Sequence, residues 1–225
     1  MPWLPLNAST YGADIDSMFF LITWITGITF VLVQVTLLVF LFLYRDRGTR
    51  RAYYTHGSAS LEVVWTVIPS IILVVLAFLS KAKWDEIKVD TPPGDIRVEV
   101  IGKQFNWEVV YPGPDREFGT GDDLTIDNQL HVPVDKVVVV SLKSIDVIHS
   151  FFVPQLRIKQ DAVPGRTISV WFEATREGVY EIPCAELCGF GHSGMKGLLT
   201  VHNQTDYDAW IEQNWPAPAV ETTAS

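Results

Sequence analysis

The stretch Met18–Tyr44 reads MFFLITWITGITFVLVQVTLLVFLFLY and contains no charged residue. At about 1.5 Å per residue, a helix of this length exceeds a hydrocarbon core about 30 Å thick. A buried helix of a soluble protein is rarely apolar all round for so long. A signal peptide would begin with basic residues, whereas Asp14 and Asp16 precede this stretch. The stretch therefore predicts a retained membrane-spanning helix.

A second apolar stretch, from about Leu61 to Trp84, predicts a transmembrane hairpin over residues 18–84. Pro69 lies in its middle, and membrane helices tolerate the kink that proline favours. The loop 45–60 between the spans is basic, so the positive-inside rule places it in the cytoplasm. Its arginines are Arg45, Arg47, Arg50 and Arg51. We therefore expect a multi-pass protein of the inner (cytoplasmic) membrane, with residues 1–17 and the chain after residue 84 on the periplasmic side. In a eukaryotic chain that side would be the mitochondrial intermembrane space.

Charge is divided unevenly along the 225 residues. Residues 1–84 carry a net charge of +2 and residues 85–225 a net charge of −11. An acidic domain argues against nucleic acid as a partner, because nucleic-acid binding needs a basic surface. It favours a cationic partner attracted over a long range, although solubility alone would also explain it.

Short alternating runs rich in β-branched and aromatic residues begin at Ile96, and they predict a β domain over residues 85–203. The runs are 96–111, 136–144, 167–174, 178–182 and 197–202. Proline and glycine separate them, which is typical of a sandwich or barrel. In the last segment, 204–225, residues 205–215 predict a helix with Thr205 or Asp206 near its cap. The tail 216–225 has a composition typical of chain without a fixed structure.

Both cysteines of the chain lie in the stretch Cys184-Ala-Glu-Leu-Cys188-Gly-Phe-Gly-His192-Ser-Gly-Met195. Thiolate, imidazole and thioether form a soft ligand set that selects copper over magnesium, calcium or manganese. Two cysteines in one loop suggest two copper ions bridged by two sulfurs. A disulfide, a zinc site and a pair of inert buried thiols are the alternatives. His149 is the best candidate for a second imidazole, although on spacing alone a core or loop role is equally good.

The whole chain through Trp215 resembles subunit II of the haem–copper cytochrome c oxidases. Three segments carry the resemblance: DVIHSFFVP at 146–154, DAVPGR at 161–166 and CAELCGFGHSGM at 184–195. The resemblance implies a membrane-anchored, cupredoxin-like Greek-key β-barrel that holds the binuclear copper centre called CuA. The implied copper ligands are His149, Cys184, Glu186 through its backbone carbonyl, Cys188, His192 and Met195. The Glu186 side chain would bind a magnesium or manganese ion shared with subunit I.

By the same resemblance, the subunit accepts an electron from cytochrome c, or from a cytochrome c domain, and passes it to haem in subunit I. There oxygen is reduced to water and protons are pumped, with the other oxidase subunits and the bilayer as further partners. The family uses a tryptophan to receive the electron, and the matching position here departs from that pattern by holding Phe105, which is otherwise a packed surface contact. Trp107 or Tyr111 are possible substitutes.

Several charged residues receive roles only through the resemblance. Glu62 is a candidate for the mouth of a proton path, or an acid favoured at a helix N-terminus by the backbone dipole. Arg166 is a candidate for contact with haem propionates. The acids that could meet lysines of cytochrome c are Asp122, Asp123, Asp127 and Asp146, each of which is equally explained as a solvated side chain.

Other proteins with the same copper loop remain as alternatives. Nitrous oxide reductase has a large propeller domain for which this chain has no room. A CuA-type nitric oxide reductase would differ in its catalytic partner. A copper-delivery protein would typically have one span and fewer ligands. No Cys-x-x-Cys-His occurs, so we expect the electron donor to be a separate protein.

Overall fold

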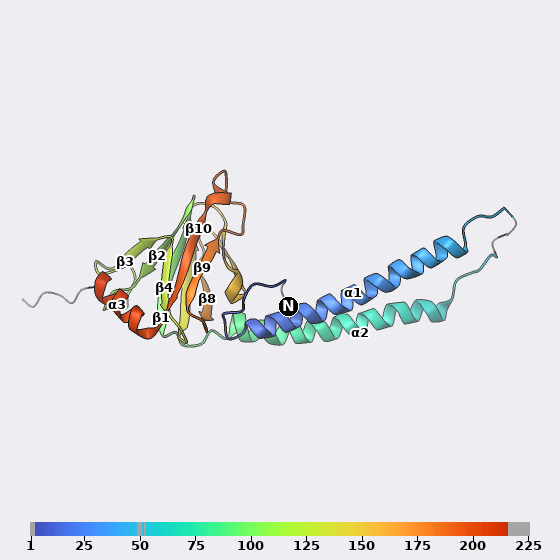
Figure 1. The fold of residues 1–225 in the computed structure, drawn as a ribbon, viewed down its shortest axis with the longest axis horizontal. Helices are drawn as coiled ribbons and strands as arrows, with labels where there is room; N and C mark the ends of the chain where they lie inside the picture. The colour runs from blue at the N-terminus through green and yellow to red at the C-terminus, as the bar shows by residue number, and fades with distance from the viewer. Residues whose placement is uncertain (1–2, 49–50, 52, 216–225) are drawn as a thin grey trace, which may run out of the picture. The chain divides into compact units, whose positions relative to one another are not determined.

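The computed structural model describes residues 3–48, 51 and 53–215 (Figure 1). The chain divides into two compact units, Asp14–Glu86 and a β-rich unit that joins the N-terminal segment, up to Ala13, to the chain from Ile87 onward. Arg50 and the predicted unstructured tail 216–225 lie outside the described residues.

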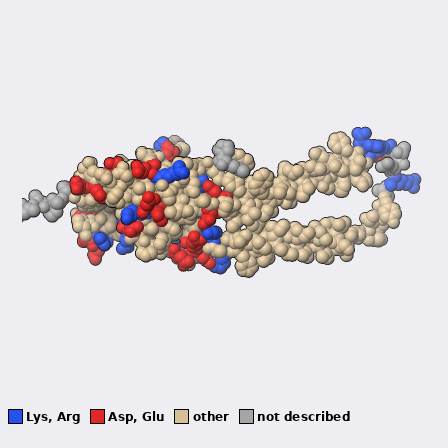
Figure 2. All heavy atoms as spheres, turned by 60° about the horizontal axis from the view of Figure 1, so that its bottom comes forward, with Lys and Arg blue, Asp and Glu red and all other residues tan. Residues whose placement is uncertain are grey.

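Two long apolar helices form the first unit, α1 (Gly12–Leu43) and α2 (Ala59–Trp84), followed by a short π-helical turn at Asp85–Val89. Both are long and apolar enough to cross a membrane. Threonine hydroxyls in α1 donate to backbone carbonyls four residues earlier, which satisfies them without water. Figure 2 shows the sides of the helices free of charge and basic side chains gathered at the connecting loop.

Helix α1 begins at Gly12, before the uncharged stretch that starts at Met18. The reason is that Asp14 and Asp16 lie in the first turns of the helix. Acidic side chains are favoured there by the partial positive charge of the helix N-terminus. Polar residues at the membrane boundary therefore extended the helix rather than ending it.

The β domain contains a five-stranded sheet in the order β3-β2-β1-β5-β8, a three-stranded sheet in the order β4-β10-β9, and the hairpin β6-β7. Pairing is antiparallel except between β1 and β5 and between β4 and β10. The strands are β1 (Ile96–Lys103), β2 (Asn106–Tyr111), β3 (Leu124–Asp127), β4 (Gln129–Pro133), β5 (Val137–Ser144), β6 (His149–Val153), β7 (Ile158–Ala162), β8 (Ile168–Glu173), β9 (Gly178–Pro183) and β10 (Lys196–His202).

The core follows from the alternation of side chains along each strand. In β5, Val138, Val140 and Leu142 are buried while their neighbours are partly exposed, as expected for a strand that faces the interior on one side. Trp107 of β2 is also buried, and its indole N–H donates to the backbone oxygen of Ile182 in β9 at 3.1 Å. This bond joins the two larger sheets through the core.

Four of the predicted strand runs are confirmed by β5, β8, β9 and β10. The prediction of one strand over 96–111 is wrong, because the chain turns at Gln104–Phe105 and forms the antiparallel pair β1–β2. Neither residue belongs to the Asn-Gly type of turn that normally announces a hairpin. The short strands β3, β4, β6 and β7 were not predicted.

Helix α3 (Gln204–Asn214) confirms the predicted terminal helix, and its cap is Asn203, close to Thr205 and Asp206. The side-chain oxygen of Asn203 accepts a hydrogen bond from the Asp206 N–H at 2.9 Å. Asparagine is one of the residues best suited to this position, since it satisfies a helical N–H that has no partner within the helix.

We expect Leu142→Ala to lower the free energy of unfolding of the β domain by about 2–5 kcal/mol, because it leaves a cavity in the core beside β5. The matched control is Leu198→Ala, at a position that is 42% exposed in β10. Urea unfolding of the full chain in detergent, followed by near-UV circular dichroism, measures both. Equal midpoints for the two variants would contradict this account of the core.

Candidate metal centre

The loop between β9 and β10 brings two thiols and a thioether into the interior. Cys184, Cys188 and Met195 are all buried, and the Cys184 N–H donates to the Met195 oxygen at 3.0 Å, which closes the loop. A β-bridge between Phe151 and Cys184 ties the loop to β6. The ligand-bearing loop is therefore held at both ends by the barrel.

The two cysteines are free thiols. Their sulfur atoms lie 3.9 Å apart, far beyond the disulfide bond length of about 2.05 Å. A metal–thiolate bond is about 2.3 Å long in zinc proteins, and two such bonds together exceed the 3.9 Å between the sulfurs. A metal ion placed to one side of the line between the sulfurs can therefore bind both, and so can a second ion on the opposite side. The spacing fits shared metal ligands better than a covalent bridge.

Each sulfur faces one histidine. Nδ1 of His149, at the start of β6, lies 3.8 Å from Cys184 Sγ, and Nδ1 of His192 lies 3.6 Å from Cys188 Sγ. The ligand atoms of His149, Cys184 and Cys188 all lie within 4.8 Å of one another. His149 comes from 35 residues upstream of Cys184, so only the fold brings these groups together.

The remaining two predicted ligands lie at the same sulfurs. The backbone oxygen of Glu186 is 3.2 Å from Cys184 Sγ, and Met195 Sδ is 3.8 Å from Cys188 Sγ. Each sulfur is thus accompanied by one imidazole and one weaker donor. All six residues predicted to hold copper converge, in an arrangement with two matching halves.

Burial, and next the neighbouring Cys184 sulfur, raise the pKa of the Cys188 thiol to about 11. The thiolate is the form that binds metal, so the protein environment by itself opposes formation of the ligand. A bound cation reverses that balance, because its positive charge stabilises the thiolate in a buried site. The cluster is therefore suited to a metal ion.

Asp146 orients His149. The carboxylate Oδ1 lies 2.8 Å from His149 Nε2, while Oδ2 accepts the Gln104 N–H at 2.6 Å. Although partial burial acts in the opposite direction, hydrogen bonds from His149 and the backbone hold the pKa of Asp146 below its ordinary value. With Nε2 engaged, Nδ1 is the nitrogen that faces the sulfur. The acid that sequence reasoning considered for docking is thus part of the site, and its position three residues before His149 is the signal that could have shown it.

The β1–β2 turn covers the loop from outside. The Gln104 side-chain amide donates to the Cys188 oxygen at 2.6 Å. The Phe105 ring lies so close to Gly191 that a Cβ there would come within 2.5 Å of it. Phe105 is still 39% exposed, whereas Trp107 is fully buried with its ring centroid 5.9 Å from that of His149. Of these two aromatic candidates, Phe105 is the one that reaches the surface.

Sequence reasoning missed the apolar tip of the loop. Phe190 is fully exposed and Leu187 is 77% exposed, beside the buried Cys188. Two large apolar side chains in a loop otherwise made of small and polar residues were the available signal. Exposed apolar side chains that gather at one point often mark an interaction surface.

The other predicted residues lie elsewhere. Glu62 is in the first turn of α2, in the helical unit. The Glu186 side chain and Arg166 are exposed, Tyr111 is buried, Asp122 and Asp123 precede β3, and Asp127 ends β3.

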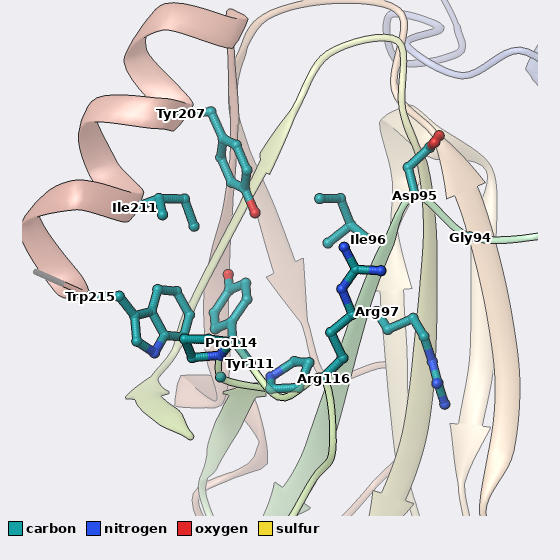
Figure 3. A pocket seen from close by; sticks show the side chains of 12 residues that line it. Gly94, Asp95, Ile96, Arg97, Tyr111, Pro114, Arg116, Tyr207, Ile211 and Trp215 are labelled. Atoms are coloured by element: carbon teal, nitrogen blue, oxygen red, sulfur yellow. The ribbon is translucent and has the colours of Figure 1, made fainter. Parts of the chain in front are cut away.

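A pocket of about 490 Å³ lies between α3 and the strands β1 and β2. Figure 3 shows Tyr207, Ile211 and Trp215 on one side of it, facing Ile96 of β1. None of the predicted metal ligands lines this pocket, so it is separate from the thiol cluster.

Comparison with known proteins gives consistent matches along the chain. Residues 104–201 match the family described as cytochrome C oxidase subunit II, periplasmic domain, and residues 7–82 match the corresponding transmembrane domain. The alternative cytochrome c oxidase subunit 2 of Bradyrhizobium diazoefficiens is 31% identical over 94% of this chain and 84% of its own length. The cytochrome c oxidase subunit 2 of Cereibacter sphaeroides is 35% identical, over 85% of this chain and 75% of its own length.

Among solved structures, the periplasmic domain of subunit II of the cytochrome oxidase of Bradyrhizobium japonicum is similar to the β domain. It has a TM-score of 0.50 and 31% identity, and the match covers 56% of this chain and 96% of that one. Together with the two apolar helices, this likeness confirms the expected fold class, a transmembrane hairpin followed by a cupredoxin-like β domain.

We expect Asp146→Ala to weaken copper retention about 10- to 100-fold, because loss of the acceptor frees the His149 ring. Asp146→Asn keeps an acceptor oxygen and should fall between this variant and the unmodified chain. Competition of the copper-loaded chain with a chelator measures retention. The control is Asp208→Ala, whose carboxylate is on the exposed side of α3. Unchanged retention in Asp146→Ala would show that Asp146 does not position the ligand.

Proposed function

Because the chain belongs to the cytochrome c oxidase subunit II family, we propose that its β domain is the electron-accepting part of a haem–copper oxidase. The observation that carries the proposal is the pair of buried, unbridged sulfurs 3.9 Å apart, each facing the Nδ1 atom of one histidine. The donor set consists of the soft ligands that copper prefers. The chain takes an electron from reduced cytochrome c and passes it to haem in subunit I, where oxygen reduction and proton pumping take place.

The proposed binuclear centre is held by six residues with distinct tasks. The thiolates of Cys184 and Cys188 would hold the metal together with the imidazoles of His149 and His192, and Met195 and the Glu186 carbonyl would add weaker donors. When bound, two copper ions that share two thiolates supply a one-electron store in which the charge change on each ion is small.

The protein contributes rigidity and exclusion of water. The loop is closed by the Cys184–Met195 backbone hydrogen bond and tied to β6, so the ligands have little room to move. His149 is fully buried and is held by Asp146 on its other nitrogen. Such outer hydrogen bonds and burial are what tune the properties of a metal site.

The surface that receives the donor is the β1–β2 turn together with the loop tip. Phe105 lies against the loop glycines, and Asn106 beside it donates to Asp127 at 2.8 Å. Two of the predicted docking acids therefore lie next to this turn, Asp127 and also Asp146, which accepts the Gln104 N–H. Figure 2 shows further acidic side chains over the β domain, consistent with long-range attraction of a basic donor.

Contacts with the catalytic subunit complete the proposal. The exposed Glu186 side chain provides a carboxylate for a magnesium or manganese ion shared with subunit I, since these ions prefer oxygen ligands. Arg166 is available for haem propionates, and Glu62 for the mouth of a proton path. The chain is anchored in the membrane by α1 and α2, and the basic loop between them supports a periplasmic position for the β domain.

We expect the full chain in detergent, loaded with copper, to be purple and to give a multi-line EPR signal from one electron shared by two coppers. Cys184→Ser and Cys188→Ser should each abolish this signal, because each removes a bridging ligand. His56→Ala, in the loop between the helices, is the control and should leave it unchanged. A colourless chain, or a signal from a single copper ion, would refute the binuclear centre.

We expect Phe105→Ala to slow electron transfer from reduced cytochrome c at least several-fold while the copper spectrum stays the same.

Asp127→Asn should mainly lower the association rate with cytochrome c and the dependence of that rate on salt. The reason is that a charge at the rim of an interface acts mainly on the rate at which the two proteins meet. Stopped-flow kinetics of the assembled oxidase at several ionic strengths separate the two effects. If Phe190→Ala slows transfer and Phe105→Ala does not, the loop tip rather than the turn receives the electron.

A further inference from the structure

Two histidines that the proposed copper centre does not use meet at the edge of the three-stranded sheet. His131 of β4 and His202 at the end of β10 have Nδ1 and Nε2 atoms 2.8 Å apart. Their rings are nearly parallel, with an interplanar angle of 17° and centroids 5.1 Å apart, and they meet edge to edge through these nitrogens. Both side chains are partly exposed, so solvent and ions can reach them.

This pair is distant from the thiol cluster. Met195 immediately precedes β10, and His202 is its last residue. At about 3.3 Å per residue, seven residues of strand separate the two positions by roughly 20 Å. The histidines therefore cannot share ligands with the loop 184–195, and any ion that they hold belongs to a different site.

The neutral imidazole is the form that binds metal, and burial favours that form in both rings. Burial, and next the nearby His202, lower the pKa of His131 to about 4. Burial also lowers the pKa of His202, against the opposing effect of Asp206. The Asp206 carboxylate, in the first turn of α3, supplies a negative charge close to the pair that would favour a cation.

The surroundings of His131 orient a lone pair toward His202. The His131 Nε2 atom lies 3.3 Å from Gln129 Oε1, and a hydrogen on Nε2 leaves Nδ1 free to accept. Metal-binding histidines usually have such a partner on the second nitrogen. Trp210 of α3 stacks on the ring face at 4.7 Å, and Tyr111 accepts the backbone N–H at 2.5 Å. These contacts fix the orientation of the His131 ring and leave its Nδ1 atom facing His202.

We propose that His131 and His202 form a second, mononuclear site for a divalent transition-metal ion, with Cu²⁺ bound most tightly. Imidazole suits copper, zinc and nickel, and copper stands highest in the affinity order of the divalent ions. In the tetragonal geometry that Cu²⁺ prefers, two neighbouring nitrogens with bonds of about 2.0 Å lie about 2.8 Å apart, which is the spacing of this pair. The rings need to turn, so that both lone pairs point at the ion. The ion replaces the shared hydrogen, which moves to the other nitrogen of His202. In the part of the chain that the structure describes, no third strong ligand joins the pair, so water completes the shell.

Such an ion would connect β4 to β10 beneath α3. Tyr207 and Trp210 of α3 lie next to the pair, and Tyr207 also lines the pocket between α3 and β1 (Figure 3). An ion that binds only the folded protein stabilises it in proportion to its concentration over the dissociation constant. The site would therefore strengthen the attachment of the terminal helix.

The test uses the full chain in detergent, with the proposed binuclear centre filled first and excess copper removed. Titration with Cu²⁺ should then add one ion per chain, with an axial EPR signal and pulsed-EPR couplings from two imidazole nitrogens. His131→Ala and His202→Ala should each weaken this uptake at least tenfold and leave the first signal intact. His202→Gln retains a polar side chain for packing and should also lose the uptake.

Controls separate this site from the proposed copper centre. His56→Ala should bind the added ion as the unmodified chain does, and the double variant Cys184→Ser/Cys188→Ser should keep the second uptake after losing the first. The proposal is overturned if the unmodified chain takes up no additional ion. It is also overturned if uptake persists in His131→Ala and His202→Ala, or disappears in His56→Ala.

Discussion

The approach of His149 to the loop that carries Cys184 and Cys188 is the contact on which the rest of the β domain depends. The histidine begins β6 and the cysteines follow β9, so their meeting requires both strands to be in place. Gly102 in β1 contributes by its lack of a side chain, since a Cβ there would come within 2.8 Å of the His149 ring. A side chain at this position would displace the ring from the sulfurs.

The burial of polar ligands has a cost that the structure offsets locally. His149 is fully buried, and its Nε2 atom has a hydrogen-bond partner in Asp146. The Asp146 carboxylate in turn accepts the backbone N–H of Gln104. Buried polar groups that lack partners are destabilising. This chain of hydrogen bonds therefore allows the His149 ring to be buried in the orientation of a metal ligand. The same turn carries Phe105. The surface that would meet a donor is thus connected to the ligand His149 through Gln104 and Asp146.

The two ends of β10 position different groups of side chains. Its beginning follows the loop with the thiols, and its end presents His202 to His131 under α3. The strand is paired on both sides, in parallel with β4 and antiparallel with β9, which fixes its backbone between the two positions. A rigid strand can hold both groups of ligands without allowing one to disturb the other.

The sequence by itself determined the membrane hairpin, because an uncharged apolar run longer than the bilayer has few other structures. It also determined the ligand-bearing loop, because two cysteines, a histidine and a methionine within one loop form a soft donor set. It also indicated the central strands, whose alternation is regular. It did not determine the turn at Gln104–Phe105 or the short strands β3, β4, β6 and β7, which lack local turn or propensity signals and are formed by pairing with neighbours. Only the tertiary structure decided that Asp146 orients His149, that Trp107 is buried while Phe105 is exposed, and that His131 meets His202. Each of these depends on which face of a strand points inward and on which distant strand lies beside it, and neither is a property of the local sequence.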